Sequence, residues 1–265
     1  MNSISKSLVV CLGLALSSSS LFADHIWVGI SAKNTGITEQ NYKSRKYLNN
    51  FTNLVEKEWR DGYSLVDVEY GYHKWLGLFA KGNVAGTQGY TTRRDFRKFL
   101  EVVKVRRKQG YSLSDVEYGG AKWLGIFSKD ASVIDEMYES RETLDAFQAT
   151  VKSAWKKGYY LSNFEYGDSI WFGVFTKSKK EMSQGIAISD DWEEIQLDIK
   201  SYWDSGYMLT NLEYGYGKWF AVFETNAGYS TQGYNSVDDI VDFAPIATKR
   251  WRDGYRLIGF AEGRD

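Results

Sequence analysis

Four glutamates recur at equivalent positions of a repeated sequence, and they are the residues best placed to do chemistry together. They are Glu69, Glu117, Glu165 and Glu213, each 48 residues from the next, with Ala261 at the fifth position. If the repeats surround an axis, four carboxylates on one strand face converge there and can bind cations or a basic ligand. Charges that close repel one another, so some of them need partners or raised pKa values.

The same glutamates can instead have a structural role, because a position that recurs in every repeat usually serves packing. In that case each carboxylate meets a Lys, an Arg, a hydroxyl or a backbone N–H group inside or beside its own unit. We expect this structural outcome, since every repeat carries basic residues near the end of its predicted helix.

Tyrosines form a second set of candidates. Tyr72 and Tyr216 lie in predicted hairpin turns, where aromatic rings can stack against sugars or peptide side chains. The strand residue Tyr70 alternates with Val68, so we expect it to be at least half buried. The candidate ligand-binding residues are therefore the four glutamates together with Tyr72 and Tyr216.

Residues for other kinds of chemistry are sparse. His25 and His73 are the only histidines, and they occupy the same turn position of the repeat. The sequence contains no G-x-S-x-G elbow, no zinc or EF-hand motif and no Gly-rich phosphate loop that opens a helix. We therefore predict no catalytic residue, no metal site and no cofactor. The alternative is a hydrolase with a carboxylate-based site at the ring axis or rim.

Two series of residues mark the repeat itself. A Gly-Tyr pair begins at Gly62, Gly110, Gly158, Gly206 and Gly254, with a constant spacing of 48. A tryptophan recurs with the same spacing at Trp27, Trp75, Trp123, Trp171 and Trp219. Five copies at one spacing indicate a single structural unit used five times. We expect the tryptophans to be buried between helix and sheet.

Each unit is predicted to contain a helix followed by a β-hairpin. In the first copy, Leu48, Phe51 and Val55 share one helix face, and Gly62 ends the helix. Two strands follow, separated by a turn at Gly71. The polar segment that opens each unit is expected to be a third short strand or an ordered loop. The predicted helix N-caps are Ser44, Thr92, Ser140 and Ser236, with Ser189 in the fourth copy.

The two ends of the chain indicate how the units are joined. The last unit ends with first-strand sequence at 256–260, and the chain opens with second-strand sequence at 26–30. Each lacks a partner within its own unit, and an unpaired strand edge invites aggregation. We therefore predict an α+β fold of five 48-residue helix-plus-β-hairpin repeats, closed into a propeller-like ring by the terminal strands. An open superhelical repeat array is the alternative.

Residues 1–23 have the pattern of a secretory signal peptide, with Lys6, a short apolar run and small residues up to Ala23. We expect an exported protein, periplasmic or extracellular, without membrane insertion after signal removal. The only cysteine, Cys11, lies in the signal, so no disulfide is available. The predicted domain covers 24–265, with strand 24–33 completing the fifth unit and repeats at 34–81, 82–129, 130–177, 178–225 and 226–265.

The charge balance argues against nucleic acid as a partner. The chain has 33 basic and 34 acidic residues and a formal net charge of −1, so no global field attracts a polyanion or an anionic membrane. Aromatic residues make up 16% of the chain and there is one proline, which indicates a well-packed core.

The fifth copy carries a family resemblance. The segments YSTQGY at 229–234, FAP at 243–245 and RWRDGYRL at 250–257 resemble an uncharacterised tandem-repeat domain. That domain is found at the C-terminus of plant casein-kinase-1-like kinases and in bacterial caspase-like proteins. The resemblance covers the mature chain at the level of motifs, although Arg107 stands where other copies have Trp. It implies a repeat module and supplies no catalytic residue.

These observations predict an exported, non-catalytic repeat module that binds a glycan or a protein partner or serves a structural role. Copies of one unit provide multivalent binding readily, whereas a catalytic site needs an asymmetric set of residues.

Overall fold

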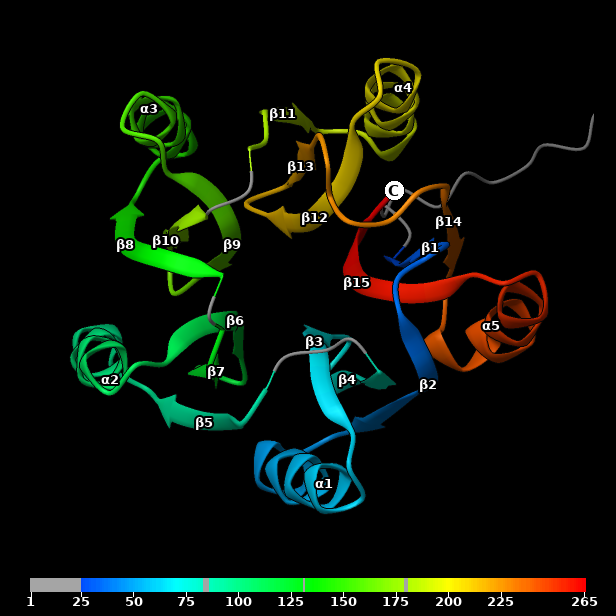
Figure 1. The fold of residues 1–265 in the computed structure, drawn as a ribbon, viewed down its shortest axis with the longest axis horizontal. Helices are drawn as coiled ribbons and strands as arrows, with labels where there is room; N and C mark the ends of the chain where they lie inside the picture. The colour runs from blue at the N-terminus through cyan, green and yellow to red at the C-terminus, as the bar shows by residue number, and fades with distance from the viewer. Residues whose placement is uncertain (1–24, 83–85, 131, 179–180) are drawn as a thin grey trace, which may run out of the picture.

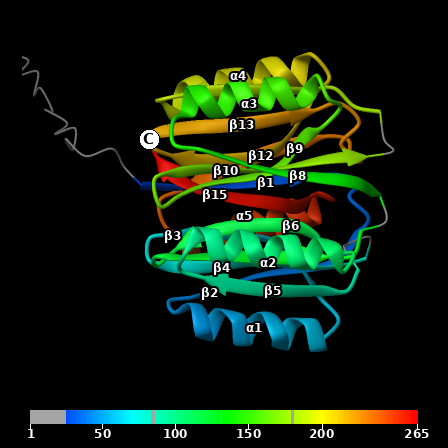
Figure 2. The same ribbon diagram turned by 90° about the vertical axis from the view of Figure 1, so that its left-hand side faces the viewer.

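The computed structural model describes residues 25–82, 86–130, 132–178 and 181–265, so the predicted signal peptide at 1–23 lies outside the described residues. The chain is an α+β protein of five repeating units, each with one main helix and a three-stranded antiparallel sheet. Figure 1 shows the five units around a common axis, with the helices on the outside. Figure 2 shows that helices and strands run along the direction of that axis.

The described residues form five α-helices: α1 (Leu48–Arg60), α2 (Phe96–Lys108), α3 (Leu144–Trp155), α4 (Trp192–Asp204) and α5 (Phe243–Arg252), the last preceded by the 3-10 turn η1 (Ile240–Asp242). In sheet order, the first three sheets are β2 (Ile37–Arg45), β4 (Lys74–Gly82) and β3 (Ser64–Gly71); β5 (Gln88–Arg93), β7 (Lys122–Ser128) and β6 (Ser112–Gly119); and β8 (Val133–Arg141), β10 (Ile170–Ser178) and β9 (Tyr160–Gly167). The last two sheets are β11 (Gln184–Ser189), β13 (Lys218–Glu224) and β12 (Met208–Gly215); and β14 (Gln232–Val237), β1 (His25–Ala32) and β15 (Arg256–Arg264).

The polar segment at the start of each unit is a strand, so the third element of the unit is a short strand and not an ordered loop. In the first unit, β2 pairs with β4 along nine residues of chain, with Lys43 opposite Gly77. Most residues of β2 are only partly buried, so its sequence can stay polar. The ladder depends on the apolar central strand β4, whose residues from Trp75 to Ala80 are all buried.

The helix starts also differ from the prediction. The predicted cap residues lie in β2, β5, β8, β11 and β14, which we call the outer strands, and not at helix caps. These residues are Ser44, Thr92, Ser140, Ser189 and Ser236. The caps come later, at positions that also recur every 48 residues. Asp95 accepts a hydrogen bond from Lys98 N at 2.9 Å, Thr143 accepts one from Ala146 N at 3.3 Å, and Asp191 accepts one from Glu194 N at 3.1 Å. A side chain at this position can reach the exposed N–H groups of the first turn.

The tryptophans of the central strands are buried, as predicted. Trp27, Trp75, Trp123, Trp171 and Trp219 are each at most 2% exposed. A glycine two residues after four of these tryptophans leaves room for an aromatic ring, whereas Ala221 stands two residues after Trp219. A Cβ atom added at Gly173 would lie 2.9 Å from the Phe147 ring, and one at Gly29 would lie 2.2 Å from the Phe243 ring. A side chain at either glycine would displace the helix ring that packs against the strand backbone.

The strands from the two chain ends share one sheet. β1 lies between β14 and β15, with Ile30 opposite Tyr234 and Ser31 opposite Leu257. The predicted pairing of the Trp27 strand with the Leu257 strand is therefore confirmed. We call β3, β6, β9, β12 and β15 the inner strands. Each inner strand contacts the inner strands of two other units.

A glutamine on the outer strand of one unit binds the inner strand of the preceding unit. Gln88 Oε1 accepts hydrogen bonds from Leu65 N and Trp59 Nε1, both at 2.8 Å, and Gln88 Nε2 donates to Leu65 O at 2.7 Å. The pairing of β3 with β4 skips a residue between Leu65 and Asp67, so β3 is bulged at this point. We call this arrangement the glutamine clamp.

The glutamine clamp recurs with the sequence repeat. Gln184 and Gln232 make the same three hydrogen bonds to their preceding units, and Gln40 of the first unit binds Leu257 N and O of the last unit at 2.8 and 2.6 Å. The neighbouring units are therefore joined by side chain–backbone bonds that are independent of the sheet ladders.

At the interface between the second and third units, a charge pair replaces the glutamine clamp. Glu136 stands at the glutamine position and accepts a hydrogen bond from Leu113 N at 3.2 Å. Arg107 stands at the position of the partner tryptophan, and its Nε lies 3.9 Å from Glu136 Oε2. The departure of Arg107 from the repeat is thus matched by a departure across the interface.

This match predicts coupled effects on stability. We expect Arg107→Trp alone to lower the free energy of unfolding by about 3 kcal/mol, because the fully buried Glu136 side chain loses its cation. Adding Glu136→Gln restores a glutamine clamp, so the double variant should recover at least half of that loss. Urea unfolding of the wild type, both single variants and the double variant measures the coupling. A double variant no more stable than Arg107→Trp would contradict the clamp.

Candidate functional site

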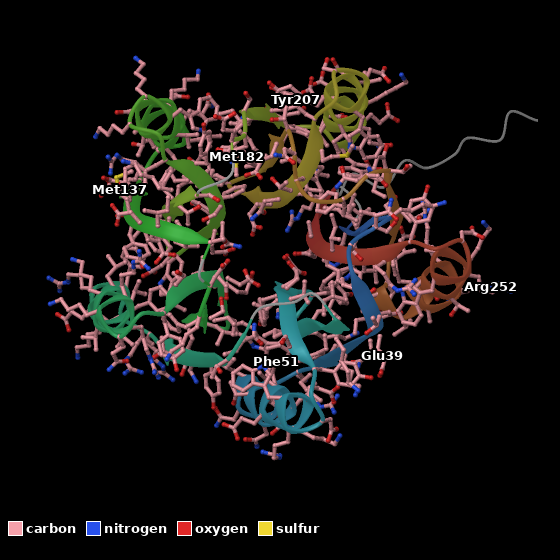
Figure 3. All side chains as sticks on the ribbon, in the orientation of Figure 1. Glu39, Phe51, Met137, Met182, Tyr207 and Arg252 are labelled. Carbon is pink, nitrogen blue, oxygen red and sulfur yellow. The ribbon has the colours of Figure 1, made fainter. Side chains whose placement is uncertain are left out.

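Six carboxyl groups from the inner strands gather near the axis. We call them the axial carboxylates: Asp67, Glu69, Asp115, Glu117, Glu165 and Glu213. An oxygen from each of Glu69, Glu117 and Glu213 lies within 4.8 Å of the other two. Five of the six, all but Glu165, line a cavity of about 140 Å³. Figure 3 shows side-chain oxygens directed into the space between the inner strands.

The bulge and the strand alternation place these side chains. After the bulge at Leu65, Val68 lies in the apolar core and Tyr70 packs against it from the same strand face. The alternate residues Asp67 and Glu69 therefore point the other way, toward the axis. The same alternation operates in the other inner strands, so the sequence repeat becomes a convergence of carboxyl groups in space.

The two aspartates among the axial carboxylates, Asp67 and Asp115, accept hydrogen bonds from backbone groups of the preceding unit. Asp67 Oδ2 accepts a hydrogen bond from Phe260 N at 2.9 Å, and Asp115 Oδ2 accepts one from Val68 N at 2.8 Å. Asn163 occupies the equivalent position in the third unit; its Nδ2 donates to Asp115 Oδ1 at 2.9 Å. These side chains connect inner strands that do not form a ladder with one another.

The axial glutamates Glu69 and Glu117 repeat this pattern. Glu69 Oε1 accepts a hydrogen bond from Glu262 N at 3.0 Å, and Glu117 accepts one from the Tyr70 backbone. The expectation of backbone donors is therefore confirmed for these two glutamates. Basic partners are not found: none of the ion pairs within the described parts of the chain involves an axial carboxylate.

Glu165 and Glu213 contact each other instead. Burial raises the pKa of Glu165, and the nearby charges of Glu117 and Glu213 raise it further. The Glu165 residue is 3% exposed, and its Oε2 is buried without a hydrogen-bond partner among the described residues. Glu213 as a whole residue is only partly buried, although its carboxyl group is enclosed.

Burial is the largest cause of a raised pKa for all six axial carboxylates. It raises the pKa of Asp67 and of Glu213 to about 7. Neighbouring negative charge adds to this effect, since Glu117 and Glu213 raise the pKa of Glu69 further. The cluster is thus an environment in which bare carboxylates are unfavourable and a positive charge is stabilised.

The fifth unit departs from the other four. Ala261 takes the glutamate position and Glu262 takes the position occupied elsewhere by tyrosine. The Glu262 carboxylate contacts His25 Nδ1, and burial raises the pKa of Glu262 to about 7. Four of the five units therefore contribute a glutamate at this position. The unit without one contains the sheet built from both chain ends.

Tyr72 and Tyr216 lie at the tips of hairpin turns and do not line the axial cavity. They are 65% and 76% exposed, and their φ angles of 47° and 54° are in the left-handed region. The Tyr72 ring lies 4.8 Å from the His25 ring, and the Tyr216 ring lies 5.9 Å from that of Tyr166. The six candidates from the sequence therefore divide into an axial cluster and an exposed pair.

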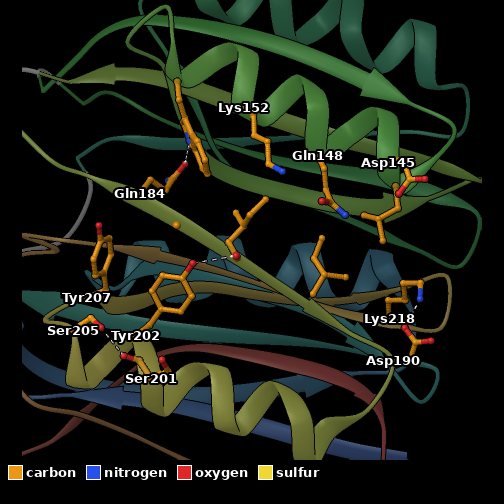
Figure 4. Close-up of a pocket in the computed structure, with 15 residues that line it drawn as sticks. Asp145, Gln148, Lys152, Gln184, Asp190, Ser201, Tyr202, Ser205, Tyr207 and Lys218 are labelled. Atoms are coloured by element: carbon orange, nitrogen blue, oxygen red, sulfur yellow. Dashed lines mark hydrogen bonds and ion pairs between the residues drawn. The ribbon is translucent and has the colours of Figure 1, made fainter.

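A groove between α3 and α4 was not predicted from the sequence. It has a volume of about 900 Å³ and runs over β11, as Figure 4 shows. Asp145, Gln148 and Lys152 project into it from α3, and the ion pair of Lys218 with Asp190 lies at one end.

Aromatic side chains form the opposite end of this groove. Trp155 donates its Nε1–H to Gln184 of the glutamine clamp at 2.7 Å. The Tyr202 ring stacks on Phe223 with centroids 4.0 Å apart, and Tyr207 packs edge-on against it. The groove thus combines partly buried rings with amide, hydroxyl and charged groups. Its sequence signal is weak, because its residues come from two units and no single unit brings them together.

A comparison with known protein families and with curated proteins finds no match to this chain. The resemblance to the tandem-repeat domain therefore stays a prediction. Among the described residues, no helix is both long and apolar enough to cross a membrane.

Glu117→Gln tests the cost of the axial charge. Glutamine keeps an oxygen that can accept from the Tyr70 backbone, and it removes a charge that burial and neighbouring carboxyl groups disfavour. At pH 8 with a chelator present, we expect the free energy of unfolding to rise by about 1–3 kcal/mol. Urea unfolding provides the measurement.

The matched control is Glu58→Gln, a buried glutamate that does have a cation. Glu58 accepts a hydrogen bond from Lys43 Nζ at 2.7 Å and its side chain is 2% exposed. Removing this charge should lower stability by about 1–3 kcal/mol. Equal losses in both variants would show that the axial charge carries no net cost.

Proposed function

We propose that the protein is an exported, non-catalytic binding module whose five units close into a propeller-like ring. Two contacts support closure: β1 lies between β14 and β15, and Gln40 of the first unit binds Leu257 of the last. The glutamine clamp is thus made between the first and last units in the same way as between consecutive units. A closed ring leaves no interface of this kind unpaired.

The ligand we propose is a glycan chain bound in the groove between α3 and α4. This groove carries the proposal because it combines the two features that sugars require, planar rings and convergent hydrogen-bonding groups. Lys152 forms no ion pair within the described residues, so its ammonium group is available to a ligand. Gln148 lies one turn earlier on the same side of α3.

A glycan suits this groove better than a folded protein partner does. A stable protein interface buries about 800 Å² on each partner around an apolar centre. The groove instead has the dimensions of a small-ligand site and a mixed polar lining. Tyr216 lies two residues before Lys218 at the groove end, so its exposed ring can extend the binding surface.

The groove lacks the residues of a hydrolytic site. Its lining includes neither histidine, and the chain from 24 to 265 has no cysteine. Among the described residues that line it, Asp145 and Asp190 are the only carboxylates, and Asp190 is paired with Lys218. These features support binding over catalysis in the groove.

A glycan array that includes peptidoglycan fragments tests the proposal. We expect wild-type protein to bind at least one glycan class, and Lys152→Ala to weaken that binding about 10-fold, because a hydrogen bond to a charged group contributes about 1.5–3 kcal/mol. Lys104→Ala is the matched control, since Lys104 is the exposed equivalent residue of α2.

Three results would contradict this function. They are the absence of binding to any glycan, an equal loss in Lys104→Ala and Lys152→Ala, and release of hydrolysis products from the bound polymer. The last result would favour the hydrolase alternative.

A further inference from the structure

We propose that the axial carboxylates form a binding site for one hard divalent cation of the size of Ca²⁺, with Glu69, Glu117 and Glu213 as ligands. This site is separate from the groove between α3 and α4, and it does not depend on what that groove binds. Its position on the axis would let one ion connect three different units.

The distances between the three carboxylates fit such an ion. Ca²⁺ binds oxygen at about 2.3–2.6 Å, so two ligand oxygens on opposite sides of the ion lie about 4.6–5.2 Å apart. One oxygen from each of Glu69, Glu117 and Glu213 lies within 4.8 Å of the other two. All three can therefore contact one Ca²⁺ without a large movement of the inner strands.

The backbone hydrogen bonds of these glutamates are compatible with ligation. A carboxylate has two oxygens, and each oxygen can accept more than one interaction. Glu69 uses Oε1 for Glu262 N, which leaves Oε2 for an ion. Glu117 likewise accepts a backbone bond from Tyr70 and retains a second oxygen.

Glu165 provides a second, independent observation. Its Oε2 is buried and has no hydrogen-bond partner among the described residues, and Glu165 itself is 97% buried. The carboxyl group reaches Glu213, one of the three proposed ligands. A buried oxygen left without a donor costs free energy, and a cation beside Glu213 would remove that cost.

The scaffold alone does not explain why these residues are acidic. In the third unit, Asn163 Oδ1 accepts a hydrogen bond from Val116 N at 3.2 Å, the same role that Asp115 has for Val68 N. A neutral amide therefore serves as a backbone acceptor at the axis. Four glutamates without a basic partner exceed what the strand contacts need, and a bound cation accounts for the excess charge.

The donor set selects the kind of ion. The side chains at the axial cavity offer carboxylate, amide and hydroxyl oxygens, and neither histidine lines it. Oxygen-only sites favour Ca²⁺, Mg²⁺ and Mn²⁺ over zinc or copper. The cavity of about 140 Å³ has room for waters that complete a shell of 6–8 ligands, whereas Mg²⁺ requires a tighter octahedron.

Isothermal titration calorimetry of chelator-treated protein tests the site, with CaCl₂, MnCl₂ and MgCl₂ as probes. We expect one Ca²⁺ per chain and at least about 10-fold weaker binding of Mg²⁺. Glu117→Gln and Glu213→Gln should each weaken Ca²⁺ binding at least about 10-fold. Glu58→Gln, which changes a buried glutamate away from the axis, should bind Ca²⁺ like the wild type.

Near-UV circular dichroism establishes that each variant is folded, and Glu213→Gln decides the test if Glu117→Gln does not fold. No binding of any of the three ions by wild-type protein up to about 5 mM would overturn the proposal and leave protons to neutralise the cluster. Unchanged Ca²⁺ affinity in both axial variants, or tighter binding of Mg²⁺ than of Ca²⁺, would also overturn it.

Discussion

The inner strands present backbone groups that no neighbouring strand pairs, and the rest of the structure depends on how those groups are satisfied. Along β3, the N–H groups of Leu65, Val68 and Tyr70 donate to side chains of the next unit. The acceptors are Gln88, Asp115 and Glu117. A buried N–H group without an acceptor costs about 1–3 kcal/mol, so these three side chains contribute to the stability of the interface between the first and second units.

This constraint links stability to the charge at the axis. The acceptors must come from the strand face opposite the apolar core, and that face converges on the centre of the molecule. Wherever an acceptor is acidic, the interface gains a hydrogen bond and the centre gains a negative charge. Asn163 shows that the interface can gain the hydrogen bond without adding a negative charge at the centre. The proposed cation site would account for the acidic residues that the contacts between strands do not require.

The constant spacing of 48 made much of the fold predictable from sequence. It identified the repeat, the buried tryptophans and the pairing between Trp27 and Leu257 strands, because these features depend on positions within one unit. The third strand was left open because a half-exposed strand has no apolar alternation to reveal it. The glutamine clamp also recurs every 48 residues at Gln40, Gln88, Gln184 and Gln232, so its spacing was readable, but its partners lie across an interface.

The candidate site was predictable to a smaller degree. Repetition singled out the four glutamates, and their place on one strand face followed from alternation. Their distances and the orphaned oxygen of Glu165 depend on how the units tilt against one another, which no single unit encodes. The groove between α3 and α4 was missed for the same reason, since Lys152 and Tyr202 belong to different units.

The sheet shared by the two chain ends also sets the order of events during synthesis. Of the described strands, β1 is the first to be made, yet its neighbours β14 and β15 are the last. About 200 residues separate Ala32 from Gln232, so at about 5–20 residues per second a ribosome takes roughly 10–40 s to supply the missing strands. The other four sheets draw their strands from contiguous chain and can form within that time. The apolar segment around Trp27 therefore lacks both of its strand partners until translation is nearly complete.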